Sequence, residues 1–169
     1  MAFSSTLRIQ QLAASDTEQM IALLTLFGEV FEDMETYSSA PPSPAYLQRL
    51  LGSDAFIALA ALKQEHLVGG LAAYELQKFE QERREIYIYD LAVATAHRRQ
   101  GIATALIREL QRIAAARAVY IIFVQADRGD EPAIALYTSL GVREDVLHFD
   151  IPVAERYAEA EPAPDITLP

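Results

Sequence analysis

The chain has 169 residues, of which 51% are hydrophobic and 22% charged, so it is long and apolar enough for one hydrophobic core and is not a disordered protein. Its formal net charge of −10 argues against binding to nucleic acid or to an anionic membrane and suits a cationic partner. The absence of cysteine excludes disulfides, thiolate zinc sites and a cysteine nucleophile, and only three widely spaced histidines are present, so we expect no metal site.

No apolar run is long enough to cross a bilayer, and the first residues lack the basic start and apolar centre of a secretory signal. We therefore expect a cytoplasmic protein. After Ile151 the composition shifts to Ala, Glu and Pro without periodicity. This shift predicts one folded domain over residues 1–151 and a poorly packed tail over residues 152–169.

The first predicted element is a short strand over residues 7–11, followed by a capping box at Ser15-Asp16-Thr17-Glu18 that opens a helix to about Phe31. The apolar stripe of this helix consists of Met20, Leu23, Leu24 and Phe27. Pro41-Pro42 then interrupts the chain, and Ser43-Pro44 begins a second helix that runs through Leu51.

The middle of the chain predicts a hairpin of two strands, residues 56–62 and 67–76, and then a strand over residues 85–93. A helix from Gly101 to about Arg117 follows, and residues 119–126 are too apolar for an exposed strand. The buried stripe of that helix is Ile102, Leu106, Leu110 and Ile113.

The end of the chain predicts a helix that starts near Asp130, a plausible N-cap, with Pro132 in its first turn and Gly141 after its last residue. Residues 147–151 alternate apolar and polar side chains and predict a last strand.

An anion site is predicted where the strand 85–93 leads through a loop into the next helix. Gly101 and Ala103 leave the backbone N–H groups of the first helical turn uncovered, and those donors favour a bound anion such as a pyrophosphate. Arg98 and Arg99 add positive charge from the loop, and Thr104 adds a hydroxyl. The pattern is neither a Walker A loop nor a G-x-G-x-x-G fingerprint.

The run Arg98-Arg99-Gln100-Gly101-Ile102-Ala103 resembles the R/Q-x-x-G-x-G/A motif of the GNAT acetyltransferases, with Ala103 in place of the second glycine. The resemblance implies that the pyrophosphate of acetyl-CoA binds at this helix start and its pantetheine arm along the preceding strand. The implied cofactor-binding residues are Leu91, Ala92, Val93, Arg98, Arg99, Gln100, Gly101, Ile102, Ala103, Thr104 and Tyr137.

A second segment, residues 133–141, resembles the GNAT pattern A-x-x-L-Y-x-x-x-G, with the tyrosine at Tyr137. The resemblance implies that the Tyr137 hydroxyl protonates the departing CoA thiolate. It also implies the GNAT fold, an α/β fold with a mixed central sheet flanked by helices, in which two parallel strands, here 85–93 and 119–126, splay apart to admit CoA.

Several segments between about Leu7 and Ile151 resemble the type I aminoglycoside 3-N-acetyltransferases, the group that modifies gentamicin and fortimicin. These segments are residues 56–61, 70–74, 78–81, 85–93, 97–107, 124–127 and 148–151. This resemblance implies acetylation of the 3-amino group of an aminoglycoside and antibiotic resistance. Dimers are common in the family, so a homodimer is expected.

Acidic side chains near the thioester are expected to hold the cationic acceptor. The candidates are Asp33, Glu35 and Tyr37 in the loop between the first two helices, and Asp90, Asp127 and Asp150 at or after strands. The amine must lose a proton before it can attack acetyl-CoA in a ternary complex, so a carboxylate is expected to accept it. Asp90 and Asp150 are both candidates for this base, and Tyr137 is the expected acid.

Two other functions fit parts of the pattern. A GNAT N-acetyltransferase for a polyamine or for a protein or peptide amine would have the same cofactor site. A non-catalytic acyl-CoA-binding domain would retain Arg98 to Thr104 but would need neither Tyr137 nor an acidic cleft.

Overall fold

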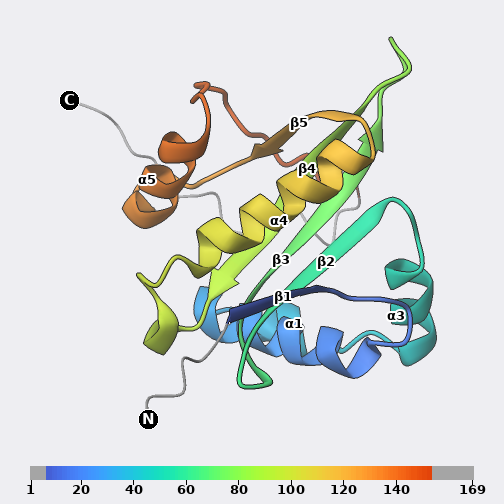
Figure 1. Ribbon diagram of the computed structural model, residues 1–169, viewed down its shortest axis with the longest axis vertical. Helices are drawn as coiled ribbons and strands as arrows, with labels where there is room; N and C mark the ends of the chain where they lie inside the picture. Colours follow the sequence, from blue (N-terminus) through green and yellow to red (C-terminus); the bar gives the residue numbers. More distant parts are fainter. Residues whose placement is uncertain (1–6, 154–169) are drawn as a thin grey trace. The chain divides into compact units, whose positions relative to one another are not determined.

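The computed structural model describes residues 7–153 of the chain (Figure 1), which divides into two units at Asp130. The first unit contains all five strands and the first four α-helices, and the second contains one helix, α5 (Glu131–Leu140). The elements of the first unit are β1 (Leu7–Gln11), α1 (Thr17–Phe31), α2 (Met34–Ser38), α3 (Pro44–Leu51), β2 (Phe56–Lys63), β3 (His66–Gln77), β4 (Arg84–Val93), the 3-10 helix η1 (Thr95–His97), α4 (Ile102–Ala116) and β5 (Val119–Val124).

The strands form one mixed sheet in the order β1-β2-β3-β4-β5. The pairs β1–β2, β2–β3 and β3–β4 are antiparallel, whereas β5 is parallel to β4. Pairing between β4 and β5 runs from Arg84 and Val119 to Ile88 and Val124 and then stops, although β4 continues to Val93. The mixed α/β sheet with two diverging parallel strands is therefore confirmed.

Helices cover both faces of the sheet, and two adjacent glycines of β3 show which helix lies on which face. A Cβ at Gly69 would meet Ile102 of α4, whereas a Cβ at Gly70 would meet Leu23 of α1. Because successive residues of a strand point to opposite faces, α4 and α1 lie on opposite sides of the sheet. A Cβ at either glycine would also come within 3 Å of a backbone oxygen of a neighbouring strand, so both positions favour glycine.

The core has one layer on each side of the sheet. On the α1 side, Leu23, Phe27 and Leu47 of the helices are almost completely buried against small residues of the strands, among them Ala58, Ala60 and Ala72. The predicted stripe of α4 is confirmed, since Ile102, Leu106, Leu110 and Ile113 are all buried. These layers leave the sheet rigid enough to position side chains at its edge.

The beginning of the chain differs from the prediction in two places. The capping box at residues 15–18 is wrong in detail: the Asp16 carboxylate accepts the backbone N–H of Ala13 at 2.8 Å, which lies before the helix, and makes no cap bond to α1. The segment predicted as a loop after Phe31 contains the short helix α2. Its N-cap is Asp33, whose carboxylate accepts the backbone N–H of Thr36 at 3.0 Å.

Two predictions for later strands are also wrong. Strand β5 is not buried, because it forms an edge of the sheet within the described residues and exposes about half of Tyr120 and Ile121. Residues 147–151 form no strand, and Leu147, Phe149 and Ile151 are each at least 75% exposed. The second unit has α5 as its one regular element within the described residues, so that unit offers the alternating segment no strand with which to pair.

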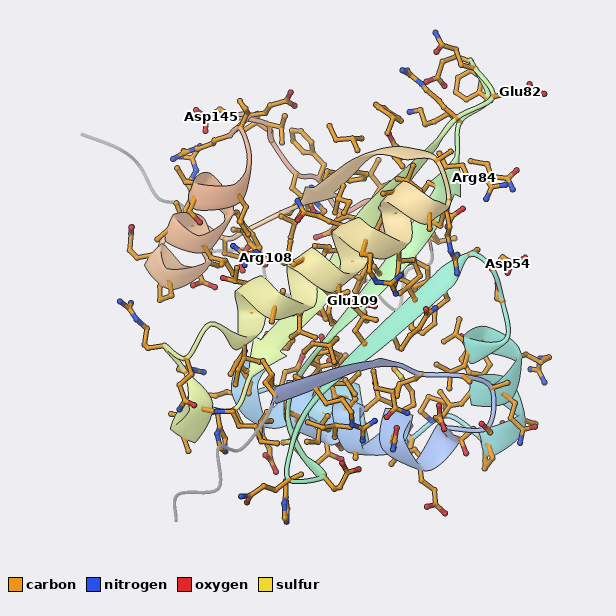
Figure 2. All side chains as sticks on the ribbon, viewed as in Figure 1. Asp54, Glu82, Arg84, Arg108, Glu109 and Asp145 are labelled. Atoms are coloured by element: carbon orange, nitrogen blue, oxygen red, sulfur yellow. The ribbon has the colours of Figure 1, made fainter. Side chains whose placement is uncertain are left out.

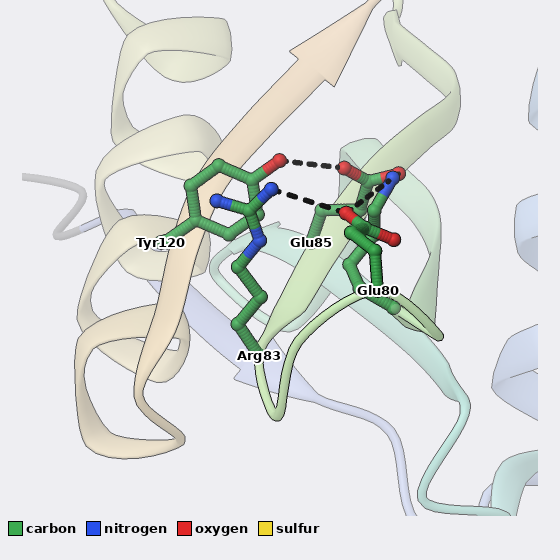
Figure 3. A network of polar contacts seen from close by, with 5 residues as sticks. Glu80, Arg83, Glu85 and Tyr120 are labelled. Carbon is green, nitrogen blue, oxygen red and sulfur yellow. Dashed lines mark hydrogen bonds and ion pairs between the residues drawn. The ribbon is translucent and has the colours of Figure 1, made fainter.

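Polar contacts hold the paired ends of β4 and β5 together (Figure 3). The Arg83 guanidinium lies 4.3 Å from the centre of the Tyr120 ring and 3.0 Å from the Glu80 carboxylate. The Tyr120 hydroxyl donates to Glu85 at 3.0 Å, and Lys78 lies within 3.5 Å of both Glu80 and Glu85. We call these five residues the hairpin cluster. It joins the β3–β4 hairpin to the start of β5.

Glu75 of β3 is the one buried charged residue among those described, with 7% of its surface exposed. Its two carboxylate oxygens lie 2.9 Å from Arg84 of β4 and 2.9 Å from Arg117 after α4. The same Arg117 nitrogen donates to the backbone oxygen of Asp54 at 2.9 Å. Glu75 therefore joins a strand, a helix end and a loop from inside the fold.

Replacing Glu75 with alanine is expected to lower the free energy of unfolding by about 2–4 kcal/mol, because two arginines lose their buried partner but can turn partly into water. Urea denaturation measures this loss. Glu82→Ala, at the hairpin tip labelled in Figure 2, is the control and should change stability by less than about 0.5 kcal/mol. Equal stability of the two variants would contradict a structural role for Glu75.

Candidate functional site

The anion site predicted from the sequence lies in the loop that connects β4 to α4. Gly101 is the N-cap of α4, with φ of +76°, and no side chain caps the helix. A Cβ at Gly101 would meet no atom within 4 Å, so the space over the helix start is open. The first N–H groups of α4 have no partner within the helix. Partial positive charge at a helix N-terminus favours an anion there.

Two further features of this loop matter for an anion. Arg99 also has positive φ, at +61°, so the backbone turns sharply twice within three residues. Arg98 donates from Nε to the backbone oxygen of Val93 at 3.3 Å, which ties the loop to the end of β4.

Lys63 at the end of β2 is a cation beside this loop that sequence reasoning missed. Its ammonium donates to the Gln100 side chain, which in turn donates to the backbone oxygen of Ala96 at 3.5 Å. The two residues of the first bond lie 37 positions apart in the chain, so no local motif signals their contact. Lys63 adds a third positive charge to the two arginines predicted from the sequence.

The diverging part of β4 lies next to this helix start. From Asp90 to Val93 the strand pairs with β3 on one side, and no strand among the described residues pairs with its other side. In a strand with one neighbour, alternate backbone N–H and C=O groups point to the free side. Leu91, Ala92 and Val93, the predicted pantetheine contacts, are in this stretch.

Asp90 sits at the start of the diverging part, at an irregularity in the β3–β4 pairing. Ala73 pairs with Ile88 and Ala72 with Asp90, so Tyr89 is an extra residue in β4. Such a bulge changes the direction in which the following side chains point. Asp90 consequently faces α2, where its carboxylate accepts the Tyr37 hydroxyl at 3.0 Å.

This pair has unusual titration properties. Burial raises the pKa of the Asp90 carboxyl above its ordinary value, and the hydrogen bond from Tyr37 partly offsets that rise. Burial and the nearby Asp90 charge together raise the pKa of the Tyr37 phenol, which therefore stays protonated as the donor. A half-buried carboxylate with a raised pKa is the kind of group that accepts a proton in catalysis.

A hollow of about 150 Å³ opens beside Asp90, between the sheet and helices α1 and α3. Its walls are mostly apolar, and Tyr46, Tyr74 and Tyr89 lie around Asp90. The volume is below the several hundred Å³ of a pocket that encloses a drug-sized molecule. The hollow therefore accommodates one functional group of a ligand and not a whole ligand.

The structure brings together only part of the predicted acceptor site. Asp33, Glu35 and Tyr37 all belong to α2 or its cap, but only Tyr37 touches Asp90. Asp33 is engaged in capping, and its hydrogen bonds with Thr36 lower the pKa of its carboxyl. Asp127 lies on the loop after β5 and is exposed.

Two predicted residues belong to the second unit. Tyr137 lies on α5, half-buried, and its backbone oxygen accepts the N–H of Gly141 at 2.9 Å, as expected at the end of the predicted helix. The carboxylate of Asp150 is 95% exposed and lies 3.1 Å from a ring nitrogen of His148. Their assigned roles in catalysis remain predictions.

Residues 7–153 contain no group of three or more His, Asp and Glu side chains placed to hold a metal ion. Within the same range, no helix combines the length and the apolar character needed to cross a membrane.

Comparison with known proteins gives a consistent result. Residues 20–142 match the model of the acetyltransferase (GNAT) family, and no curated protein matches the chain. The crystal structure of an aminoglycoside acetyltransferase, HMB0005, from an uncultured soil metagenomic sample is 64% identical, with a TM-score of 0.87 over 88% of this chain and 99% of that one.

Two more distant structures share the fold. The aminoglycoside acetyltransferase meta-AAC0020, also from a soil metagenomic sample and solved with sisomicin, is 36% identical, with a TM-score of 0.81 over 88% of this chain and 97% of that one. A ribosomal-protein-alanine N-acetyltransferase from Brucella melitensis biovar Abortus 2308 is 26% identical, with a TM-score of 0.69 over 88% and 100% of the two chains.

Proposed function

Because the chain belongs to the acetyltransferase (GNAT) family, we propose that it transfers the acetyl group of acetyl-CoA to the 3-amino group of an aminoglycoside such as gentamicin, and so confers antibiotic resistance. The similarity to two aminoglycoside acetyltransferases supports the substrate class. The observation that carries the proposal is the half-buried Asp90 carboxylate, held by Tyr37 where β4 and β5 diverge. The catalytic domain is proposed to span residues 1–151, with a tail over residues 152–169.

The helix start at Gly101 fits the pyrophosphate of acetyl-CoA. Its N–H donors are uncapped, the space above them is open, and Arg98, Arg99 and Lys63 supply positive charge close by. The backbone groups of Leu91 to Val93 that point away from β3, other than the Val93 oxygen that accepts Arg98, are suited to the amides of the pantetheine arm, which would bond to them as an added strand does. Bound in this way, acetyl-CoA supplies the activated acetyl group as a thioester.

The acceptor amine must be neutral to attack, and Asp90 is proposed to take its proton. If the amine had the pKa of a lysine, about 10.4, its deprotonation at pH 7 would cost about 4.6 kcal/mol. A carboxylate with a raised pKa reduces this cost by accepting the ammonium proton before the nitrogen attacks the carbonyl carbon. The nitrogen loses a second proton to solvent as the amide forms. A backbone N–H near Val93 is proposed to stabilise the charge that develops on the carbonyl oxygen.

The carbon–sulfur bond then breaks, and Tyr137 is proposed to return a proton to the CoA thiolate. This role follows from the family motif in α5. Asp150 stays a second candidate for the base, although its exposed carboxylate lacks the burial that distinguishes Asp90.

Thiol release from acetyl-CoA tests the proposed function. The chain is mixed with acetyl-CoA and, in parallel, with gentamicin, spermidine or a peptide bearing a free amino terminus. Of the three acceptors, we expect only gentamicin to give rapid thiol release. NMR of the product should place the acetyl group on the 3-amino nitrogen. Preferred turnover of spermidine or of the peptide would replace the proposed substrate, and no release with any acceptor would refute the enzyme activity.

Removal of the Tyr37 hydroxyl should alter the pH dependence of this reaction. The groups around Asp90 are five tyrosines with Asp33 beside the first of them: Tyr37 of α2, Tyr46 of α3, Tyr74 of β3, and Tyr87 and Tyr89 of β4. Among the side chains of residues 7–153, Tyr37 is the one that donates a hydrogen bond to the carboxylate, and this bond favours the ionised form.

In Tyr37→Phe the pKa of Asp90 therefore rises. The base must be ionised, so the acidic limb of kcat/KM should move to higher pH. At the acidic pH values of this limb, kcat/KM of the variant should be about 2- to 10-fold lower than that of the wild type, which corresponds to the loss of one hydrogen bond. Tyr46→Phe, which removes a hydroxyl from the same hollow, should leave the limb in place. An unshifted limb in Tyr37→Phe would contradict the proposed coupling.

A further inference from the structure

A continuous row of aromatic rings crosses the sheet beside Asp90. Phe56, Tyr74, Tyr87 and Phe123 are partners in the register of four neighbouring strands, β2 to β5. Neighbouring ring centres along this line are 5.2 Å apart for the first pair and 4.9 Å apart for the last. We call these four residues and Tyr89 the aromatic row.

Tyr89 adds a fifth ring to the row from the same face of β4 as Tyr87, because residues two apart in a strand share a face. Its ring lies between those of Tyr74 and Tyr87, with centre distances of 5.8 Å and 5.7 Å in edge-to-face geometry. Ala72 pairs with Asp90 and Tyr74 pairs with Tyr87, and the two β3 residues share a face, so the bulge brings Asp90 to the face of the row. The bulge therefore places the proposed base beside the row.

The row is anchored at one end and open along the rest. Phe56 is buried in the core, whereas Tyr89 is 61% exposed and Tyr74 and Phe123 are each more than one third exposed. Adjacent exposed aromatic side chains are unfavourable in water unless a ligand covers them. The Tyr87 hydroxyl donates to Gln125 at 3.1 Å, which fixes that ring in place.

We infer that the aromatic row is the platform on which the aminoglycoside acceptor lies, with its ammonium groups over the tyrosine rings. The inference rests on the proposed function. The hollow at Asp90 has room for one functional group, so the remaining rings of an aminoglycoside must lie outside it. The aromatic row is the surface that continues from that hollow, since Tyr74 and Tyr89 belong to both.

The chemistry of the row suits a polycation that is also a sugar. Aromatic faces attract ammonium groups through the negative potential of the ring, most strongly when water is excluded. Asp90 supplies a formal negative charge at one side of the row, and the chain as a whole carries −10. Ammonium groups held by rings keep more freedom to shift than groups held by a fixed ion pair, so the platform suits several related aminoglycosides.

Calorimetric titration with gentamicin in the presence of CoA tests the platform directly. Tyr89→Leu and Tyr87→Leu should weaken gentamicin binding about 2- to 30-fold, while the affinity for CoA stays unchanged. Tyr89→Phe keeps the ring and should bind within about twofold of the wild type. Phe123→Leu, at the end of the row, tests the platform without touching the neighbour of Asp90.

Phe79→Leu is the matched control, because Phe79 is 99% exposed at the β3–β4 hairpin and lies outside the row. Normal gentamicin binding by all three leucine variants of the row, with a wild type that acetylates gentamicin, would overturn the platform and leave the proposed function intact. A wild type that neither binds nor acetylates gentamicin would overturn both. A change in sedimentation of Tyr89→Leu without a change in gentamicin affinity would assign the row to contact between copies of the chain instead.

Discussion

Replacement of Asp90 by asparagine is expected to lower kcat by a factor of about 10² to 10⁴, the usual contribution of a general base. Asparagine has the same shape and can still accept the Tyr37 hydroxyl, so the fold around β4 and α2 should be retained. What it loses is the capacity to take a proton. KM for acetyl-CoA should change little, because the anion site at Gly101 involves other residues.

The pH profile separates loss of the base from loss of positioning. As pH rises, a growing share of the acceptor amine is neutral in solution and needs no base, so part of the Asp90→Asn defect should disappear. A positioning defect would persist at every pH. Asp54→Asn, an exposed aspartate before β2 that is labelled in Figure 2, should behave as wild type. Full activity of Asp90→Asn together with a large loss in Asp150→Asn would move the base to Asp150.

Replacement of Gly101 by valine is expected to weaken CoA binding about 10- to 100-fold, as measured by titration calorimetry. Two effects act together. A β-branched residue at φ of +76° is strained by about 1–2 kcal/mol, and its relief would turn the first N–H groups of α4 away from their present directions. The new side chain would also enter the open space that the pyrophosphate is proposed to fill. Loss of charge-assisted hydrogen bonds of about 1.5–3 kcal/mol corresponds to this range.

Gly129→Val is the control for strain alone. Gly129 has φ of +98° and, like Gly101, nothing within 4 Å of an added Cβ, but it lies in the loop after β5. The two variants should lose comparable stability on thermal unfolding, and only Gly101→Val should lose affinity for CoA. Equal CoA affinity in the two variants would contradict the assignment of the α4 N-terminus as the pyrophosphate site.

The parts of the site that the sequence predicts are those encoded locally. The strand, the loop and the glycine that opens α4 lie within about twenty consecutive residues, and each has its own signal in composition or period. The observed N-cap at Gly101 and the buried stripe of α4 match the expectation. Strand β1 and the start of α3 at Pro44 were predictable for the same reason.

The parts that escaped prediction depend on contacts between distant segments. Tyr37 and Asp90 are 53 positions apart, and their meeting requires both α2 and the bulge at Tyr89, neither of which has a clear sequence signal. The aromatic row depends on the register of four strands. The segment 147–151 shows the opposite error, because alternation alone predicted a strand where the second unit provides no partner within the described residues.

The hairpin cluster has a consequence for the rate and energy of cosubstrate binding. Arg83, Glu85 and Tyr120 fasten one end of the β4–β5 pair through contacts among protein side chains, and strand pairing stops beyond Ile88 and Val124. We therefore expect the separation at the other end to be present before acetyl-CoA binds. Such preorganisation increases affinity, because no binding free energy is spent on separating the two strands. Acetyl-CoA should accordingly bind with little rearrangement of the backbone, because its site is formed in the free enzyme.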